Sequence, residues 1–160
     1  MIFVIGVDLV GKTTYIKKNF IRKPYFHSTV PTQKNKQQYY EYWENIIKNA
    51  DKDTVFDRAF YCELPYSTIL KTKPLLDIEM INKLEMQIIK KDYKSKVIFL
   101  KATKDILYKR YDSRGDELIE KEQLIPIQML YEEMLKYFML KIEVKEINGK
   151  WPYRSEWYAK

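Results

Sequence analysis

The stretch GVDLVGKTT, from Gly6 to Thr14, decides how the rest of this chain is interpreted, because it fits the pattern G-x-x-x-x-G-K-[ST]. The apolar run Met1–Ile5 before it is typical of a buried strand, and a helical pattern follows it from Thr14 to Ile21. The glycines let successive backbone N–H groups turn inward at the positive end of that helix. We therefore predict a phosphate-binding loop, and its expected nucleotide-binding residues are Gly6, Asp8, Val10, Gly11, Lys12, Thr13 and Thr14.

Two side chains of this loop suit the handling of a nucleoside triphosphate. The Lys12 ammonium can reach the β- and γ-phosphates, and the Thr13 hydroxyl can hold Mg²⁺. A chance match on a glycine turn is the alternative, but the chain has only 4 glycines, and two of them stand at the spacing of the motif. We therefore expect ATP as the phosphate donor and Mg²⁺ as the metal cofactor.

Length and composition predict one globular domain over residues 1–160. The 29 basic and 22 acidic side chains give a net charge of +7, which suits an acidic or phosphorylated ligand. Cys62 is the single cysteine, which excludes an internal disulfide and, with His27 as the single histidine, an ordinary structural zinc site. The sequence shows neither a signal peptide nor an apolar run of about 20 residues, so we expect a cytoplasmic protein without a membrane segment.

Short apolar runs alternate with longer helical patterns along the chain. We expect strands over residues 1–5, 25–29, 54–57, 96–100 and 142–147, and helices over 14–21, 33–49, 75–92, 103–113 and 122–140. The apolar face of the first helix would consist of Tyr15, Ile16, Phe20 and Ile21. Strands separated by helices predict an α/β fold in which a parallel sheet carries helices on both faces.

The third expected strand ends in Asp57, which Arg58 follows. The carboxyl ends of the strands form the edge at which doubly wound sheets bind their ligands. At this edge Asp57 can orient Mg²⁺-bound water or accept a proton, and the planar fork of Arg58 can hold a phosphate. A surface ion pair that caps a helix is the alternative, but the neighbouring phosphate loop favours a function. We expect Thr13 and Asp57 as metal ligands, and Lys12, Asp57 and Arg58 as catalytic residues.

The segment RYDSRGDE places Arg110 and Arg114 four residues apart on one helical face, just before Gly115. On a hinged segment such a pair can close over the transferred phosphoryl group and neutralise the charge that develops there. The alternative is an exposed face on which the arginines pair with the acids of the same segment. We predict a short lid over about residues 109–122, with both arginines as catalytic residues.

These stretches together resemble the thymidylate kinase and deoxynucleoside kinase group of P-loop kinases. GVDLVGKTT is similar to the thymidylate kinase loop, which has an acid at the position of Asp8 and a second threonine, here Thr14. DRAFYCELPY, residues 57–66, resembles the family pattern D-R-[YF]-x-x-S-x-x-A-Y, although Cys62 and Pro65 replace the Ser and the Ala. RYDSRG matches the R-x-x-x-R-G lid, and EINGKWP, residues 146–152, resembles the loop beside adenine.

The resemblance implies a three-layer P-loop NTPase fold with a five-stranded sheet in the order 2-3-1-4-5 and an ATP-dependent nucleotide kinase. It also implies that Asp8, Arg58 and Tyr66 contact the acceptor. The helix QQYYEYWENII forms the acceptor wall in the family, which makes Trp43 a candidate for stacking on the base, with Phe60 and Tyr61 as further rings. An aromatic stripe at helical spacing is more often part of the core, and that alternative stays open for these rings.

One position departs from the family in a way that bears on the acceptor. Val30 stands where the nucleoside kinases have the glutamate that removes the 5′-hydroxyl proton. A monophosphate acceptor is already ionised and needs no base, so we expect a deoxynucleoside monophosphate as the acceptor. The alternative is a kinase that acts on a hydroxyl of a deoxynucleoside, of a nucleic-acid end or of a modified base, with Asp57 as the base.

The expected partner is therefore the nucleotide substrate. The basic residues are scattered and no DNA-binding motif is present, so a nucleic-acid partner is not favoured. A nucleotide sensor without transfer is a third alternative, against which the intact Lys12, Thr13 and Asp57 argue. Thymidylate kinase-like proteins are commonly dimers, so the resemblance also allows a homodimer.

Overall fold

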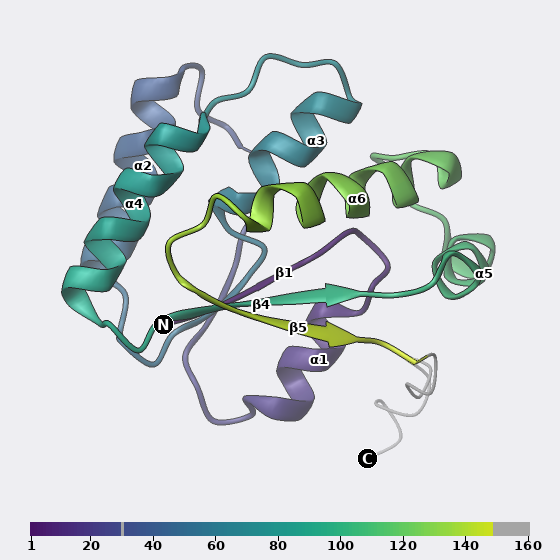
Figure 1. The fold of residues 1–160 in the computed structure, drawn as a ribbon, viewed down its shortest axis with the longest axis horizontal. Helices are drawn as coiled ribbons and strands as arrows, with labels where there is room; N and C mark the ends of the chain where they lie inside the picture. The colour runs from purple at the N-terminus through teal and green to yellow at the C-terminus, as the bar shows by residue number, and fades with distance from the viewer. Residues whose placement is uncertain (30, 149–160) are drawn as a thin grey trace.

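The computed structural model describes residues 1–29 and 31–148, and in this part of the chain five parallel strands form one sheet (Figure 1). The strands are β1 (Ile2–Ile5), β2 (Tyr25–His27), β3 (Val55–Asp57), β4 (Lys96–Lys101) and β5 (Lys141–Glu146). Their order across the sheet is β2-β3-β1-β4-β5, which confirms the predicted order. All four residues of the central strand β1 are apolar, as expected for a strand of a sheet that helices cover on both sides.

The helices form the two outer layers of the fold. On one face of the sheet lies α1 (Lys12–Asn19), and on the other lie α3 (Glu63–Ile69) and α6 (Leu124–Leu135) (Figure 1). Helices α2 (Lys36–Asn49) and α4 (Ile78–Lys91) lie next to one another, near the beginning of β4 and β5. Helix α5 (Lys104–Arg114) lies beyond the ends of these two strands. Short 3₁₀ turns at Phe60–Cys62 and Lys121–Gln123 lead into α3 and α6. The predicted three-layer α/β fold is thereby confirmed.

An aromatic cluster fills the core between the sheet and the helices opposite α1. Phe3 of β1 and Phe56 of β3 are stacked with their ring centroids 4.7 Å apart, and Trp43 of α2 meets Phe60 nearly edge-on at 5.4 Å. All four side chains are fully buried, and large aromatic rings contribute strongly to such a core. The cluster fixes β3, whose last residue is Asp57.

Helix α3 was not expected from the sequence. Pro65 would break the interior of a helix, but it lies in the first turn of α3. Backbone N–H groups in a first turn have no intrahelical acceptor, so the absence of this group in proline costs no hydrogen bond there. Ile21 was expected on the apolar face of the first helix but is 79% exposed, because α1 ends at Asn19. Both differences follow from where the helices begin and end, which the apolar periodicity does not determine.

Three helices are shorter than predicted, and the one expected over 75–92 spans Ile78–Lys91. The helix expected over 33–49 begins at Lys36, because the Asn35 side chain caps it by accepting a hydrogen bond from the Gln38 N–H. The helix expected over 122–140 ends at Leu135, and a turn leads from there to β5.

Two stretches singled out in the sequence fall outside the described residues. They are Val30 and the part of EINGKWP from Gly149 onward. The argument from Val30 therefore stays a sequence argument. In residues 1–29 and 31–148, no helix combines the length and the apolar character that crossing a membrane requires.

A buried carboxyl group ties α4 to the entry of β5. Glu85 of α4 is fully buried, accepts a hydrogen bond from the Tyr61 hydroxyl at 2.8 Å, and accepts another from the Met139 N–H at 2.6 Å. Burial raises the pKa of Glu85, although these hydrogen bonds oppose the rise. The contact joins three segments that are distant in sequence.

We predict that Glu85→Ala lowers the free energy of unfolding by about 2–4 kcal/mol, because Tyr61 and Met139 each lose the partner of a donor group. Urea denaturation followed by circular dichroism measures the loss. Glu79→Ala is the matched control, since Glu79 lies on the same helix in an exposed pair with Lys83 and should change stability by less than about 1 kcal/mol. Similar losses in the two variants would contradict the structural role of Glu85.

Candidate functional site

The loop between β1 and α1 follows a path that only glycine permits at its two ends. Gly6 has a φ of 142° and Gly11 a φ of 100°. A Cβ atom on Gly6 would lie 2.4 Å from the Leu100 carbonyl oxygen, so β4 leaves no space for a side chain. Leu9 adopts a φ of 67° without being glycine, and such strained residues gather at functional sites. The loop is thus a fixed turn that ends at the first N–H groups of α1.

Lys12, the first residue of α1, folds back over this turn. Its Nζ donates hydrogen bonds to the carbonyl oxygens of Gly6 and Val7 at 2.7 and 2.9 Å and lies 3.6 Å from Asp8 Oδ1. The N–H groups of the first helical turn have no intrahelical partner, and the helix dipole is positive there. The Lys12 ammonium group and the N-terminus of α1 therefore both favour the binding of an anion at the same place.

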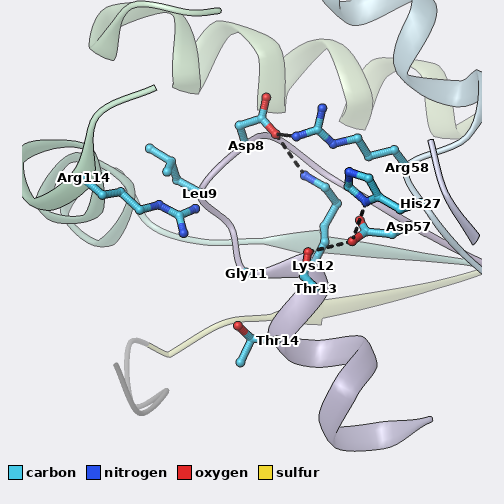
Figure 2. A pocket seen from close by; sticks show the side chains of 10 residues that line it. All are labelled: Asp8, Leu9, Gly11, Lys12, Thr13, Thr14, His27, Asp57, Arg58 and Arg114. Atoms are coloured by element: carbon cyan, nitrogen blue, oxygen red, sulfur yellow. Dashed lines mark hydrogen bonds and ion pairs between the residues drawn. The ribbon is translucent and has the colours of Figure 1, made fainter. Parts of the chain in front are cut away.

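The carboxylate of Asp57 lies beside the loop and is fully buried (Figure 2). Its Oδ2 accepts hydrogen bonds from the Thr13 hydroxyl at 2.7 Å and the Tyr25 hydroxyl at 2.9 Å, and His27 Nδ1 lies 3.3 Å from the same oxygen. Within the described chain, Asp57 Oδ1 is buried without a hydrogen-bond partner. Leaving a buried acceptor unpaired costs about 1–3 kcal/mol or more, so this atom points to a missing donor.

The arrangement fits a magnesium ion bound together with phosphate. Mg²⁺ usually takes one or two protein oxygens and completes its shell with water and substrate phosphates. The Thr13 hydroxyl donates a hydrogen bond to Asp57, which leaves the lone pairs of its oxygen for a cation, and Asp57 Oδ1 can accept a hydrogen bond from metal-bound water. No group of three or more His, Cys, Asp or Glu side chains in residues 1–29 and 31–148 could hold a metal by itself. Thr13 and Asp57 are therefore the residues that would hold the ion.

Asp8 connects the loop with two residues expected to contact the acceptor. Its Oδ1 accepts a hydrogen bond from Arg58 Nη2 at 2.5 Å, and its Oδ2 accepts one from the Tyr66 hydroxyl at 2.9 Å. Burial raises the pKa of Asp8, but the charges of Lys12 and Arg58 and the hydrogen bond from Tyr66 outweigh it and hold this pKa below its ordinary value. Asp8 is thus an ionised carboxylate that orients Arg58 and Tyr66.

Arg58 stands in a strained turn directly after β3. Arg58 has a φ of 81° and Ala59 a φ of 85°, and conformations of this kind cost about 1–3 kcal/mol each. The Arg58 N–H donates to the Val4 carbonyl oxygen at 3.0 Å, which joins the turn to β1. Arg58 Nε is buried and has no partner in the part of the chain that the structure describes. The turn directs the guanidinium group toward the phosphate loop with a donor still to be used.

The two lid arginines differ in position, contrary to the expectation that they act as a pair. Arg110 Nη1 donates hydrogen bonds to the carbonyl oxygens of Leu9 and Val10, both at 2.8 Å, and so braces the loop from α5. Arg114, the last residue of α5, lines the pocket, and its guanidinium group lies on the Leu9 side of the loop in Figure 2. Arg114 is among the residues that line the pocket, whereas the Arg110 contacts described here are to the backbone of the loop.

These side chains surround a pocket of about 100 Å³ at the carboxyl edge of the sheet (Figure 2). Small-molecule sites usually measure roughly 300–1,000 Å³, so the pocket suits the phosphate groups of a nucleotide rather than a whole nucleotide. The lining residues are Asp8, Leu9, Gly11, Lys12, Thr13, Thr14, His27, Asp57, Arg58 and Arg114. All except Leu9 and His27 were predicted from the sequence.

His27 was missed because its position depends on the sheet order. The Cα atoms of His27 and Asp57 are partners in the parallel pairing of β2 with β3. A polar residue at the end of the strand that neighbours β3 is the signal that could have found it. Leu9 was missed because the motif accepts any residue at its position, although its strained backbone conformation brings it to the pocket.

Several predicted contact residues lie away from the pocket. Trp43 is fully buried in the aromatic core, which corrects its assignment to base stacking and supports the core alternative; Phe60 and Tyr61 are buried in the same way. Val10 is also buried, and its carbonyl oxygen accepts a hydrogen bond from Arg110. Gly6 shapes the turn without lining the pocket.

Comparisons with known proteins agree with this geometry. No protein-family model matches the chain. A thymidylate kinase from Campylobacter hominis is 30% identical over an alignment that covers 93% of this chain and 91% of the relative. The SPbeta prophage-derived protein YorR of Bacillus subtilis is 34% identical over 58% of this chain and 55% of its own length.

Solved structures share the fold. The crystal structure of YorR from Bacillus subtilis in complex with phosphorylated GDP superimposes with a TM-score of 0.74 at 24% identity, covering 94% of this chain and 86% of that one. Deoxyadenosine kinase from M. mycoides with bound dATP gives a TM-score of 0.51 at 19% identity, covering 93% of both chains. At these identities the likeness establishes the fold alone.

We predict that the two lid arginines have separable effects on the kinetics. Arg110→Ala should raise the KM for ATP about 10-fold, because the charged hydrogen bonds that hold the loop are lost. Arg114→Ala should chiefly lower kcat, by about 100-fold, because a cation near the transferred group is lost. Steady-state kinetics measure both, with the exposed Arg22→Ala as control. A fall in kcat of the same size in both variants at unchanged KM would contradict the division.

Proposed function

The chain belongs to the thymidylate kinase family, and we propose that it transfers the γ-phosphoryl group of ATP to a deoxynucleoside monophosphate. The family makes it a nucleotide kinase, an enzyme that uses an ATP-type nucleotide. The observation that carries the choice of acceptor is the guanidinium group of Arg58, held at the pocket by Asp8 beside the phosphate loop. The residue roles that follow belong to this proposal.

The donor side consists of the loop and Lys12. The N–H groups at the start of α1 bind the β-phosphate, and the Lys12 ammonium moves its hydrogen bonds from loop carbonyls to the β- and γ-phosphate oxygens. Arg110 keeps the loop in place through the Leu9 and Val10 carbonyl groups. Arg114 contacts the transferred group at the mouth of the pocket, where negative charge develops.

Thr13 and Asp57 hold the metal. A bound Mg²⁺ would supply positive charge to offset the negative charge of the donor phosphates. Thr13 Oγ1 would offer its lone pairs to the ion while its hydroxyl continues to donate a hydrogen bond to Asp57 Oδ2, and Asp57 Oδ1 would accept a hydrogen bond from water bound to the ion. This role explains why a fully buried carboxylate has one oxygen without a donor.

The acceptor side is built around Arg58. A monophosphate is ionised near neutral pH, so its oxygen can attack once it is clamped and its charge is offset. The planar fork of Arg58 suits two phosphate oxygens, and Asp8 with Tyr66 fixes the direction of the fork.

The competing reaction, transfer to a hydroxyl, requires a base. Asp57 was the candidate, but its Oδ2 already accepts two hydrogen bonds, and its Oδ1, which has no partner in the described chain, is assigned to the metal in this proposal. The next acid along the chain, Glu63, accepts the Leu75 N–H at 2.6 Å. These contacts favour the monophosphate acceptor over the hydroxyl acceptor.

We expect the protein to phosphorylate deoxynucleoside monophosphates in the presence of ATP and Mg²⁺. Chromatographic assay of a panel of monophosphates, deoxynucleosides and short oligonucleotides tests this. Lys12→Ala should lower kcat by about 100-fold or more, because a charge at the transferred phosphates is lost. Turnover of deoxynucleosides or oligonucleotides without turnover of monophosphates would overturn the proposed acceptor.

We further predict that Arg58→Ala raises the KM for the monophosphate about 10-fold or more, because a charge-assisted contact to its phosphate is lost, and leaves the KM for ATP nearly unchanged. The KM of Arg58→Lys for the monophosphate should lie between those of the wild type and Arg58→Ala, since lysine keeps the charge but not the planar guanidinium group. The exposed Arg22→Ala is again the control. An Arg58→Ala enzyme with wild-type affinity for the acceptor would contradict the assignment.

A further inference from the structure

We infer that Tyr25 and His27 are positioning residues that hold Asp57 Oδ2, so that Oδ1 alone is presented to the metal and the phosphates. The inference rests on the role of Asp57 in the proposed function. Both side chains come from the edge strand β2 and belong neither to the phosphate-loop motif nor to the pattern that begins at Asp57.

The pairing of β2 with β3 brings the two side chains to Asp57. His27 is the Cα partner of Asp57, and Tyr25 is the partner of Val55, two residues earlier. Side chains alternate along a strand, so Tyr25 and His27 share a face of the sheet with Asp57. Phe26, between them, packs against other rings of the core on the opposite face. The long Tyr25 side chain spans the offset, and its hydroxyl reaches the carboxylate.

The contacts to Asp57 are one-sided. The hydroxyl groups of Thr13 and Tyr25 donate to Oδ2 at 2.7 and 2.9 Å, and His27 Nδ1 lies 3.3 Å from the same atom. Oδ1 has no partner in the described chain. A carboxylate with its partners on one oxygen loses them when it rotates, so these groups fix its orientation, as outer groups do for metal ligands in general.

The contribution of β2 differs from that of Thr13. Thr13 belongs to α1 and would contact the ion itself, so its bond to Asp57 depends on the state of the phosphate loop. Tyr25 and His27 belong to the sheet and support one another, since their rings are 6.4 Å apart at 29° and the Tyr25 hydroxyl lies 3.4 Å from His27 Nδ1. They therefore hold Asp57 independently of the loop.

A direct contact of His27 with the acceptor is the alternative, because the side chain lines the pocket and is 44% exposed. In Figure 2 the imidazole lies between Asp57 and Arg58, with one ring nitrogen facing the carboxylate. Asparagine separates the two roles. Its amide keeps a donor near the place of Nδ1 and cannot take up a proton, so His27→Asn should restore positioning but not base catalysis.

The test measures the magnesium requirement of ADP binding, which needs neither an acceptor nor turnover. Calorimetric titrations with ADP at a series of free Mg²⁺ concentrations compare wild type with Tyr25→Phe, His27→Leu, their double variant and His27→Asn. We expect the half-saturating Mg²⁺ concentration to rise about 3-fold in each of the first two variants and about 10-fold in the double variant, with His27→Asn close to wild type. ADP affinity in EDTA should not change. Tyr93→Phe, at a tyrosine that is 78% exposed, is the control.

A second background shows whether the effect passes through Asp57. Adding Tyr25→Phe to Asp57→Asn should not raise the magnesium requirement further, because the carboxylate through which Tyr25 acts is already gone. An additive effect there, or an unchanged requirement in a double variant that circular dichroism shows to be folded, would overturn the inference. So would reduced ADP affinity in EDTA or a His27→Asn variant that behaves like His27→Leu. Wild-type protein that leaves monophosphates unphosphorylated would instead overturn the proposed acceptor, and the magnesium measurement would still stand.

Discussion

The carboxylate of Asp8 determines where the cations of this site stand. It lies 2.5 Å from Arg58 and 3.6 Å from Lys12 and accepts a further hydrogen bond from Tyr66. A partly buried charge is costly unless it is paired, so two cations can gather at the end of β1 only with an anion between them. The phosphate loop, the turn after β3 and helix α3 are all joined through this one group, and the geometry of the pocket depends on it.

The place of the loop was predictable because it depends on a local pattern, whereas the strand order was implied by the resemblance to the P-loop kinases. The motif after β1 permits only a strand before it and a helix after it, and an acid that closes a buried strand marks the carboxyl edge of the sheet. Helix α3 was not predicted because a proline such as Pro65 is tolerated in the first turn of a helix but disrupts its interior, and the sequence does not specify where the helix begins. For Trp43 the sequence left two alternatives open, base stacking and the core, because either face of an aromatic helix can meet the sheet, and the structure buries this ring in the core.

The missed parts of the site come from contacts between segments distant in sequence. Arg110 meets carbonyl groups about 100 residues earlier, and nothing in its own helix distinguishes it from Arg114. Tyr25 and His27 reach Asp57 only because β2 pairs with β3 in one register. A shift by one residue would turn Phe26 toward the carboxylate instead. The register, fixed by the aromatic core on the other face, therefore decides which groups surround Asp57.

We propose a phosphate rather than a hydroxyl acceptor partly because of the charges that face the pocket. Lys12, Arg58 and Arg114 supply three cations against the two carboxylates of Asp8 and Asp57, and Asp57 is buried and engaged through Oδ2. An acceptor phosphate brings negative charge that the surplus cation and the metal offset, and such interactions strengthen where water is excluded. A neutral hydroxyl gains nothing from this surplus and needs a proton acceptor, which nearby cations make less basic. The balance of charge thus favours the ionised acceptor.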